Sequence, residues 1–186
     1  AAAWRTAFAD VAEADIAEGS VLDVQADAIV SPANSFGYMD GGVDLAYCRF
    51  FGFEIQERLQ AHLHEHHFGE LPVGSAVVIE TSHQAIPFLI SAPTMRVPSS
   101  VARSINVYLA FRAALITALK HNRTSPGRTI HTIAVPGMGT GVGEVSPSRA
   151  ANHMRVAYDS ILGKNRSRRR NVGQIWGEHQ ELLARE

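Results

Sequence analysis

The stretch "ADAIVSPANSFGYMDGGVDLAYCRFF", residues 26–51, decides the fold of this chain. Its first part, 26–31, is a short apolar run bounded by turn residues, as in a buried strand. Its last part, 43–51, has the pattern of a helix and ends at Gly52. The loop between them combines an amide, two adjacent glycines and a carboxylate, at Asn34, Gly41, Gly42 and Asp44.

Apolar runs typical of strands alternate with segments of helical period along the rest of the chain. We predict strands at 74–81, 87–93 and 129–135, and helices at 53–67, 101–121 and from Pro147 to about Leu162, with Ser146 as the N-cap. A helical end at 4–9 and a weak strand at 11–16 come before them. This alternation predicts an α/β layer structure with a largely parallel central sheet.

The composition sets the limits for function. A chain of 186 residues with 46% apolar residues suits one domain, expected over 1–186, in which we leave 164–186 unassigned. The formal net charge of -1 gives no reason to expect nucleic acid or a membrane as partner. Cys48 is the only cysteine, which favours a reducing, cytoplasmic compartment. No apolar run reaches transmembrane length, and the chain does not start like a signal peptide.

Two glycine-rich loops, 31–42 and 136–146, follow predicted strands. Ligands of open α/β sheets bind beyond the carboxyl ends of strands. The second loop has glycine at every second position, at Gly137, Gly139, Gly141 and Gly143, and no lysine or arginine between Pro136 and Ser148. A phosphate there would be held by backbone N–H groups and by the helix N-terminus that follows. Neither common glycine-rich phosphate motif fits this loop, and a flexible connection that binds nothing is the alternative.

The first loop offers different chemistry. The Asn34 amide can donate and accept hydrogen bonds. The Asp44 carboxylate falls in the first turn of the predicted helix, where the helix dipole favours it. Each residue alone also fits an ordinary structural role, Asn34 as a loop cap and Asp44 as a first-turn acid.

Three stretches together resemble a known family. "GSVLDVQADAIVSPAN" (19–34), "GGVD" (41–44) and "AVPGMGTGVGEVSP" (134–147) are similar to the motifs of macro domains, which bind ADP-ribose. The resemblance runs from Gly19 to about Leu162 and suggests a bacterial or phage-associated branch. It implies a three-layer α/β/α fold with a mixed, largely parallel sheet, and a cytoplasmic protein that needs no cofactor and no metal.

The resemblance also implies roles for individual residues. Asn34 would bind the distal ribose, and Asp44 would activate or orient a water at the anomeric carbon. Gly41, Gly42 and Val43 would line the diphosphate and the distal ribose, and the loop 137–143 would wrap the diphosphate. The full implied set of ligand-binding residues is Ser20, Val21, Ala33, Asn34, Gly41, Gly42, Val43, Gly137, Gly139, Thr140, Gly141, Val142 and Gly143.

Four positions depart from the family pattern: Ser20, Ser31, Asp40 and Gly143. Ser20 replaces an aspartate beside adenine, and Gly143 replaces an aromatic residue found in many hydrolase members. Three functions therefore stay open. The chain hydrolyses an ADP-ribosyl linkage, on ADP-ribosylated protein or a small molecule; or it is a non-catalytic ADP-ribose-binding module; or it is a phage or structural interaction protein that has lost the ligand.

Four further features have competing interpretations. His62 and His66 lie four apart on a helix but lack a clear third metal ligand. The basic run 164–170 could touch nucleic acid or form a solvated charge run. Cys48 is expected to be a buried small apolar residue rather than a nucleophile. Arg96 could reach a phosphate or form a surface ion pair.

Overall fold

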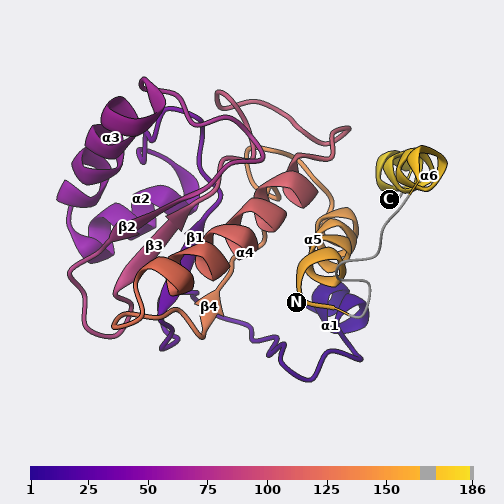
Figure 1. Ribbon diagram of the computed structural model, residues 1–186, viewed down its shortest axis with the longest axis horizontal. Helices are drawn as coiled ribbons and strands as arrows, with labels where there is room; N and C mark the ends of the chain where they lie inside the picture. The colour runs from indigo at the N-terminus through magenta and orange to yellow at the C-terminus, as the bar shows by residue number, and fades with distance from the viewer. Residues whose placement is uncertain (164–170, 185–186) are drawn as a thin grey trace.

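The computed structural model describes residues 1–163 and 171–184 (Figure 1). Six helices and four strands are formed by the described residues. In chain order they are α1 (Ala2–Ala7), β1 (Ala28–Ser31), α2 (Gly42–Phe51), α3 (Glu54–His67), β2 (Val77–Glu80), β3 (Phe88–Ser91), α4 (Asn106–Thr124), β4 (Ile133–Ala134), α5 (Pro147–Ile161) and α6 (Val172–Ala184). Within this part of the chain, no helix is both long and apolar enough to cross a bilayer.

The four strands form one mixed sheet in the order β2-β3-β1-β4. β1 pairs in parallel with β3 on one side and with β4 on the other, while β2 runs antiparallel to β3. All residues of β1 and β3 are buried, as expected for parallel strands that are covered on both faces. β1 is therefore the centre of the fold, and the carboxyl ends of β1, β3 and β4 lie at one edge.

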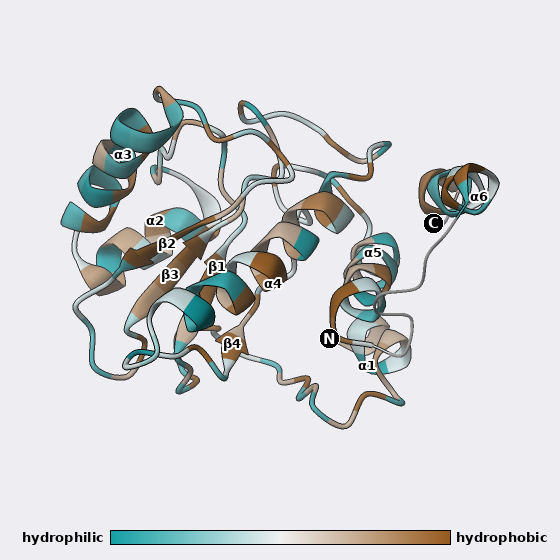
Figure 2. Cartoon of the chain, in the orientation of Figure 1, coloured by the Kyte–Doolittle hydropathy of each residue, from teal (hydrophilic) through white to brown (hydrophobic). Residues whose placement is uncertain are grey.

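Two apolar clusters cover the two faces of the sheet. Alternate residues of β1 separate them: Ala28 and Val30 join the cluster of α4, α5 and α1, whereas Ile29 joins the cluster of α2 and α3. Figure 2 shows the strands as mostly hydrophobic and the outward surface of α3 as hydrophilic. The predicted α/β fold with a mixed, largely parallel sheet between helical layers is thus confirmed.

Most predicted elements are present with shifted ends. The helix start is placed correctly at Ser146, whose hydroxyl accepts a hydrogen bond from the Arg149 N–H, with Pro147 at the first helical position. The weak strand at 11–16 is wrong, because this segment is irregular in the structure. Its apolar side chains, Val11, Ala14 and Ile16, pack on the α4–α5 cluster without pairing to the sheet.

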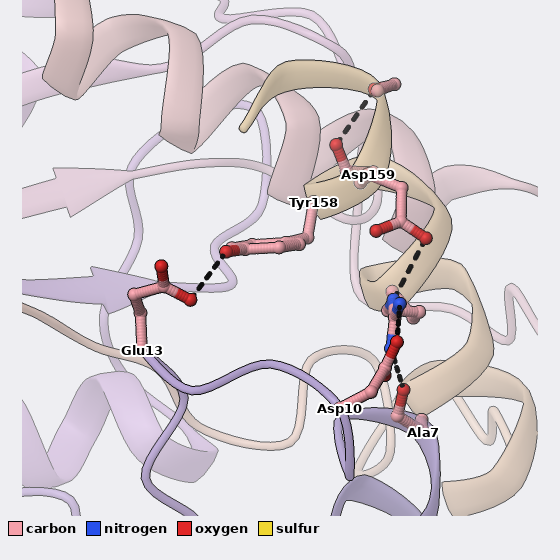
Figure 3. Close-up of polar contacts among 8 residues, drawn as sticks. Ala7, Asp10, Glu13, Tyr158 and Asp159 are labelled. Carbon is pink, nitrogen blue, oxygen red and sulfur yellow. Dashed lines mark hydrogen bonds and ion pairs between the residues drawn. The ribbon is translucent and has the colours of Figure 1, made fainter. Parts of the chain in front are cut away.

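Polar contacts fasten the N-terminal segment to α5 (Figure 3). The Arg155 guanidinium donates to the Ala7 carbonyl at 2.7 Å, to both carboxylate oxygens of Asp10, and to Asp159 at 2.9 Å. The Tyr158 hydroxyl donates to Glu13 at 3.4 Å. The first part of the segment before β1, from Ala7 to Glu13, is therefore held to α5.

The C-terminal region, unassigned from the sequence, contains α6. The carbonyls of Leu182 and Leu183 contact His153 Nε2 at 2.8 Å and Arg149 Nη2 at 3.1 Å, so α5 holds the last turn of α6. Leu182 is buried, while the large apolar side chains in the first turns of α6 are exposed. The basic run 164–170 lies outside the described residues.

Asp27 joins the start of β1 to the segment that enters β4. Its Oδ2 accepts hydrogen bonds from the backbone N–H groups of His131 at 2.7 Å and Thr132 at 2.8 Å, and from the Thr132 hydroxyl at 3.0 Å. Burial raises the pKa of this carboxyl, but these hydrogen bonds outweigh it and hold the pKa below its usual value. Asp27 thereby sets the position of the short strand β4.

We expect Asp27→Ala to lower the free energy of unfolding by about 1.5–3 kcal/mol, because two backbone donors lose a charged acceptor. The matched control is Asp23→Ala, which removes an exposed carboxylate from the same segment and should change stability by less than about 0.5 kcal/mol. Urea unfolding at pH 7 measures both. Equal effects of the two variants would contradict this role of Asp27.

Candidate functional site

The carboxyl ends of the parallel strands carry three loops, 32–41, 92–105 and 135–146. The first two are tied together. The Thr94 N–H donates to the Ala33 carbonyl at 3.0 Å, and the Ser35 N–H donates to the Arg96 carbonyl at 3.1 Å. The third loop follows β4, the neighbour of β1 in the sheet. Loops 32–41 and 135–146 therefore leave adjacent strands at the same edge.

Asn34 organises the first loop with its own side chain. Its Oδ1 accepts from the N–H groups of Phe36 at 3.1 Å and Tyr38 at 3.3 Å, and its Nδ2 donates to the Tyr38 carbonyl at 2.7 Å. This is the loop-capping role that the sequence left open. An amide has two N–H donors, so one remains for a ligand.

The N-terminus of α2 has no side-chain cap. Gly41 is the N-cap residue, and it has no side chain to accept from the first N–H groups of the helix. By contrast, Ser146 caps α5. The end of α2 therefore presents unpaired N–H groups and the positive end of its dipole, which favours an anion.

The loop 137–143 presents a second set of donors. Apart from the tight turn at 138–139, none of its backbone N–H groups donates a hydrogen bond to any residue in the described part of the chain. The loop is nevertheless ordered: the Val145 N–H donates to the Gly139 carbonyl at 3.0 Å, and the Val101 N–H donates to the Gly143 carbonyl at 2.9 Å. Met138 is fully buried. An ordered run of free donors suits an anion better than a flexible connection does.

The glycines of the two loops fall into two groups. A Cβ at Gly41, Gly42 or Gly141 would meet no atom within 4 Å, so these positions face open space. A Cβ at Gly143 would lie 2.6 Å from the Gly139 carbonyl oxygen, and one at Gly139 would lie 2.8 Å from Val107. The first group leaves room for a ligand, whereas the second allows the chain to pack. Gly143 thus cannot be replaced by the aromatic residue of the family pattern without moving the loop.

Asp44 lies in the first turn of α2 and is 8% exposed. Its Oδ1 accepts a hydrogen bond from the Ser31 hydroxyl at 2.7 Å. Burial raises the pKa of this carboxyl to about 6, although the Ser31 hydrogen bond acts in the opposite direction. A carboxyl group with a pKa near neutrality suits proton transfer. The sequence analysis identified Ser31 only as a position that departs from the family pattern, and it did not predict the contact with Asp44.

The other residues implied by the resemblance are scattered over these loops. Thr140 donates through its hydroxyl to the Gly137 carbonyl at 2.9 Å. The Ser20 hydroxyl accepts from the Leu22 N–H at 3.2 Å. Val142 is exposed, Ala33 is buried, and Val21 and Val43 pack partly on the α2–α3 cluster. None of these side chains carries a charge, so any ligand charge falls to backbone groups.

The remaining candidates are accounted for by structural contacts. Arg96 pairs with both carboxylate oxygens of Glu70, at 2.7 and 3.0 Å, and stacks over Phe36. Of the two interpretations of Arg96 in the sequence, the structure therefore favours the surface ion pair. Cys48 is buried, as predicted. The rings of His62 and His66 lie 4.5 Å apart, and the described residues contain no group of three potential metal ligands among His, Cys, Asp and Glu.

Comparison with known proteins supports the resemblance seen in the sequence. A sequence model of the family described as "Macro domain" matches residues 30–154. An uncharacterised protein of Aquifex aeolicus is 38% identical over 139 residues, covering 75% of this chain and 76% of the relative. An uncharacterised protein of Aeropyrum pernix is 32% identical over 149 residues, covering 80% and 72%.

Solved structures share the fold. The macrodomain of Mycobacterium tuberculosis DarG superposes with a TM-score of 0.56 at 24% identity, covering 78% of this chain and 89% of that one. The Oceanobacillus iheyensis macrodomain with ADP superposes with a TM-score of 0.60 at 20% identity, covering 79% of this chain and 75% of that one. The Trypanosoma brucei macrodomain in complex with ADP-ribose superposes with a TM-score of 0.57 at 22% identity, covering 78% of this chain and 57% of that one.

The buried carboxyl of Asp44 gives a test of stability against pH. Its pKa in the folded chain, about 6, exceeds the value of about 3.9 in an unfolded chain. The folded state therefore binds the proton more tightly, and stability falls as pH rises from about 4 to about 6. We expect Asp44→Asn to raise the free energy of unfolding by about 2–3 kcal/mol at pH 7.5 and by about a third of that at pH 4.5. Urea unfolding at both pH values measures this difference, and a pH-independent effect would argue against a buried charge.

The two groups of glycines give a second test. We expect Gly143→Ala to lower the free energy of unfolding by about 1–3 kcal/mol, because the new methyl group would press on the Gly139 carbonyl. Gly141→Ala, in the same loop but facing open space, should stay within about 0.5 kcal/mol of the wild type. Thermal unfolding of the two variants side by side provides the comparison. If Gly141→Ala is destabilised as much as Gly143→Ala, the assignment of the two groups is wrong.

Proposed function

The chain belongs to the macro domain family, and on that premise we propose that it binds ADP-ribose and hydrolyses an ADP-ribosyl linkage, with ADP-ribosylated protein as the substrate class. One observation carries the proposal. The carboxyl of Asp44 lies in the first turn of α2, at the uncapped helix end that belongs to the candidate anion site. An acid–base group beside an anion site is what hydrolysis of a nucleotide-linked ribose requires.

The binding step rests on backbone dipoles. The free N–H groups of loop 137–143 and of the N-terminus of α2 donate hydrogen bonds to the diphosphate of ADP-ribose. Gly41, Gly42 and Gly141 leave the space for it. The second N–H of the Asn34 amide, in loop 32–41, donates to a ribose hydroxyl. Solved relatives of the same fold hold ADP and ADP-ribose, which supports this ligand class.

The chemical step requires Asp44 in its ionised form. The carboxylate orients a water molecule and accepts its proton as the water oxygen bonds to the anomeric carbon of the distal ribose. The bond from that carbon to the modified side chain breaks, and the electron pair leaves with the protein group. Positioning of the water against the bound diphosphate contributes as well. Because the pKa of Asp44 is about 6, the ionised fraction is high at neutral pH.

A non-catalytic ADP-ribose-binding module is the second candidate. The favouring observation is that Asn34 uses its Oδ1 and one of its two N–H groups within the loop, and that Asp44 is nearly covered. In this case the loops bind the nucleotide, and Asp44 has a structural role: its hydrogen bond with Ser31 holds α2 against β1. Binding and turnover measured on the same variants separate the two candidates.

Calorimetric titration with ADP-ribose tests the binding step. We expect Gly41→Val to weaken binding at least tenfold, because the added side chain enters space that the ligand needs and meets no protein atom. Gly41 has φ of -148°, which a side chain tolerates. Gly127→Val is the matched control, since Gly127 also faces open space but lies in the turn after the C-terminal end of α4. No heat from the wild type would refute the binding proposal.

Release of ADP-ribose from a mono-ADP-ribosylated protein tests the chemical step. We expect Asp44→Ala to reduce turnover by about 10²–10⁴-fold, the usual contribution of a general acid or base. Its affinity for ADP-ribose should stay within a few fold of the wild type. If both proteins bind ADP-ribose and release it from the substrate at the same rate, the binding module is the correct function.

A further inference from the structure

The hydrogen bond between Ser31 and Asp44 joins the end of β1 to the carboxyl group that we propose for hydrolysis. Ser31 is the last residue of β1 and is fully buried, and its hydroxyl donates to Asp44 Oδ1 at 2.7 Å. The two residues come from different layers, the sheet and α2, and are 13 positions apart in the chain. The hydroxyl is thus a fixed link between the sheet and the carboxyl group.

The position of the Ser31 side chain is set by the strand. Its carbonyl accepts a hydrogen bond from the Ala92 N–H at 2.9 Å, and its Cα is in register with Ser91 of β3. Side chains of a strand alternate between faces, and Ile29 of β1 points to the α2–α3 cluster. Ser31, two residues later, points to the same face. The donor is therefore held by backbone pairing rather than by a flexible loop.

The contact leaves one carboxylate oxygen available. Asp44 Oδ2 accepts no hydrogen bond from any described residue. It is also absent from the buried polar atoms that lack a partner, which include the hydroxyl of Ser91. Oδ2 therefore keeps some exposure to solvent, while Oδ1 is bonded to Ser31 at the end of β1. A carboxylate held by one oxygen can direct the other at a water molecule.

We propose that Ser31 is the positioning residue of Asp44: its hydroxyl fixes Oδ1, so that Oδ2 faces the reacting water at the uncapped end of α2. This assignment rests on the proposed hydrolysis for its catalytic consequence. Ser31 itself touches no substrate. Its contribution is to hold the carboxyl group in one rotamer and to favour the ionised form, because the hydrogen bond is made to the charged oxygen.

The other groups beside Asp44 do not replace Ser31. Tyr47 and Cys48 lie on α2 within its electrostatic reach, and burial, followed by the charge of Asp44, raises the pKa of both. Both are neutral at the pH of an assay. The Tyr47 hydroxyl donates to the Val30 carbonyl at 3.0 Å and is thus engaged. On the strand side, Ser91 is the neighbouring polar residue, and its hydroxyl has no partner.

Ser91→Ala is therefore the matched control for Ser31→Ala. The two serines are register partners on adjacent strands, both are buried, and each substitution removes one hydroxyl from the same face of the sheet. They differ in that the hydroxyl of Ser31 donates a hydrogen bond to Asp44, whereas that of Ser91 has no hydrogen-bond partner among the described residues.

The first readout is the titration of Asp44 itself, followed through its side-chain carboxyl carbon by NMR in the ligand-free protein. We expect Ser31→Ala to move the midpoint upward by about half a unit to one unit, and Ser91→Ala to leave it unchanged. This measurement needs no substrate. An unchanged midpoint in Ser31→Ala, or equal shifts in both variants, would overturn the assignment.

The second readout is the pH profile of ADP-ribose release. In Ser31→Ala the acidic limb should move upward with the NMR midpoint, so that the rate at pH 6 falls about fivefold for a shift of one unit. The KM should stay within about twofold. If the wild type binds ADP-ribose but releases none from the substrate at any pH, the proposed hydrolysis fails while the NMR result still decides the role of Ser31.

A second pair of variants covers the case in which Ser31→Ala does not fold. Ser31→Thr and Ser31→Val have nearly the same shape, and β-branched side chains suit a strand. They differ in the hydroxyl alone. We expect Ser31→Thr to keep the wild-type midpoint and pH profile and Ser31→Val to show the shift. If the threonine and valine variants behave alike, the hydroxyl has no positioning role.

Discussion

The parallel pairing of β1 with β3 and β4 is the constraint on which the rest of the molecule depends. It brings three chain segments to one edge with their carboxyl ends together. The loop after β1 leads into α2, and the loop after β4 leads into α5. Each helix then starts at the same edge, with its N–H groups directed towards it. The two sets of free donors are thus a consequence of strand direction, and the glycines make them accessible.

The same arrangement explains why a carboxyl group can be buried at the edge. Asp44 follows the N-cap of α2 closely, so the helix dipole offsets part of the cost of removing its charge from water. Ser31 supplies a hydrogen bond from the sheet. The remaining cost appears as the raised pKa of Asp44. Under the proposed hydrolysis, this loss of stability would keep a proton acceptor at neutral pH, as is common at functional sites.

Local patterns in the sequence predicted most elements, but they missed α6, gave a wrong strand at 11–16, and did not give the ends of the other elements. The apolar run at 26–31 and the helix at 43–51 are found at Ala28–Ser31 and Gly42–Phe51. The strand predicted at 129–135 is shorter, because the N–H groups of Ile130 and His131 bond to side chains of Asn122 and Asp27 instead of to a strand. Such distant partners are invisible in a local pattern.

The long helix predicted from 101 starts at Asn106 for a related reason. The Val101 N–H bonds to the glycine loop, and the Ser104 carbonyl accepts from Arg149. These contacts hold residues 101–105 in the loop that precedes α4, so the helix cannot start earlier. In the candidate site, Asn34, Gly41 and Asp44 were identified through the family resemblance of the sequence. The contact of Ser31 with Asp44 was not, since it depends on how α2 packs against β1.

The lack of cationic side chains in loop 137–143 has a consequence for selectivity. Neutral N–H dipoles act over short distances and must be met one by one, whereas lysine and arginine attract any anion from afar. A site built from dipoles therefore gains nothing from the greater total charge of a long polyphosphate or a nucleic acid strand. If the loop binds a diphosphate as proposed, it would distinguish anions by their fit to a fixed row of donors, and its affinity would change little with salt concentration.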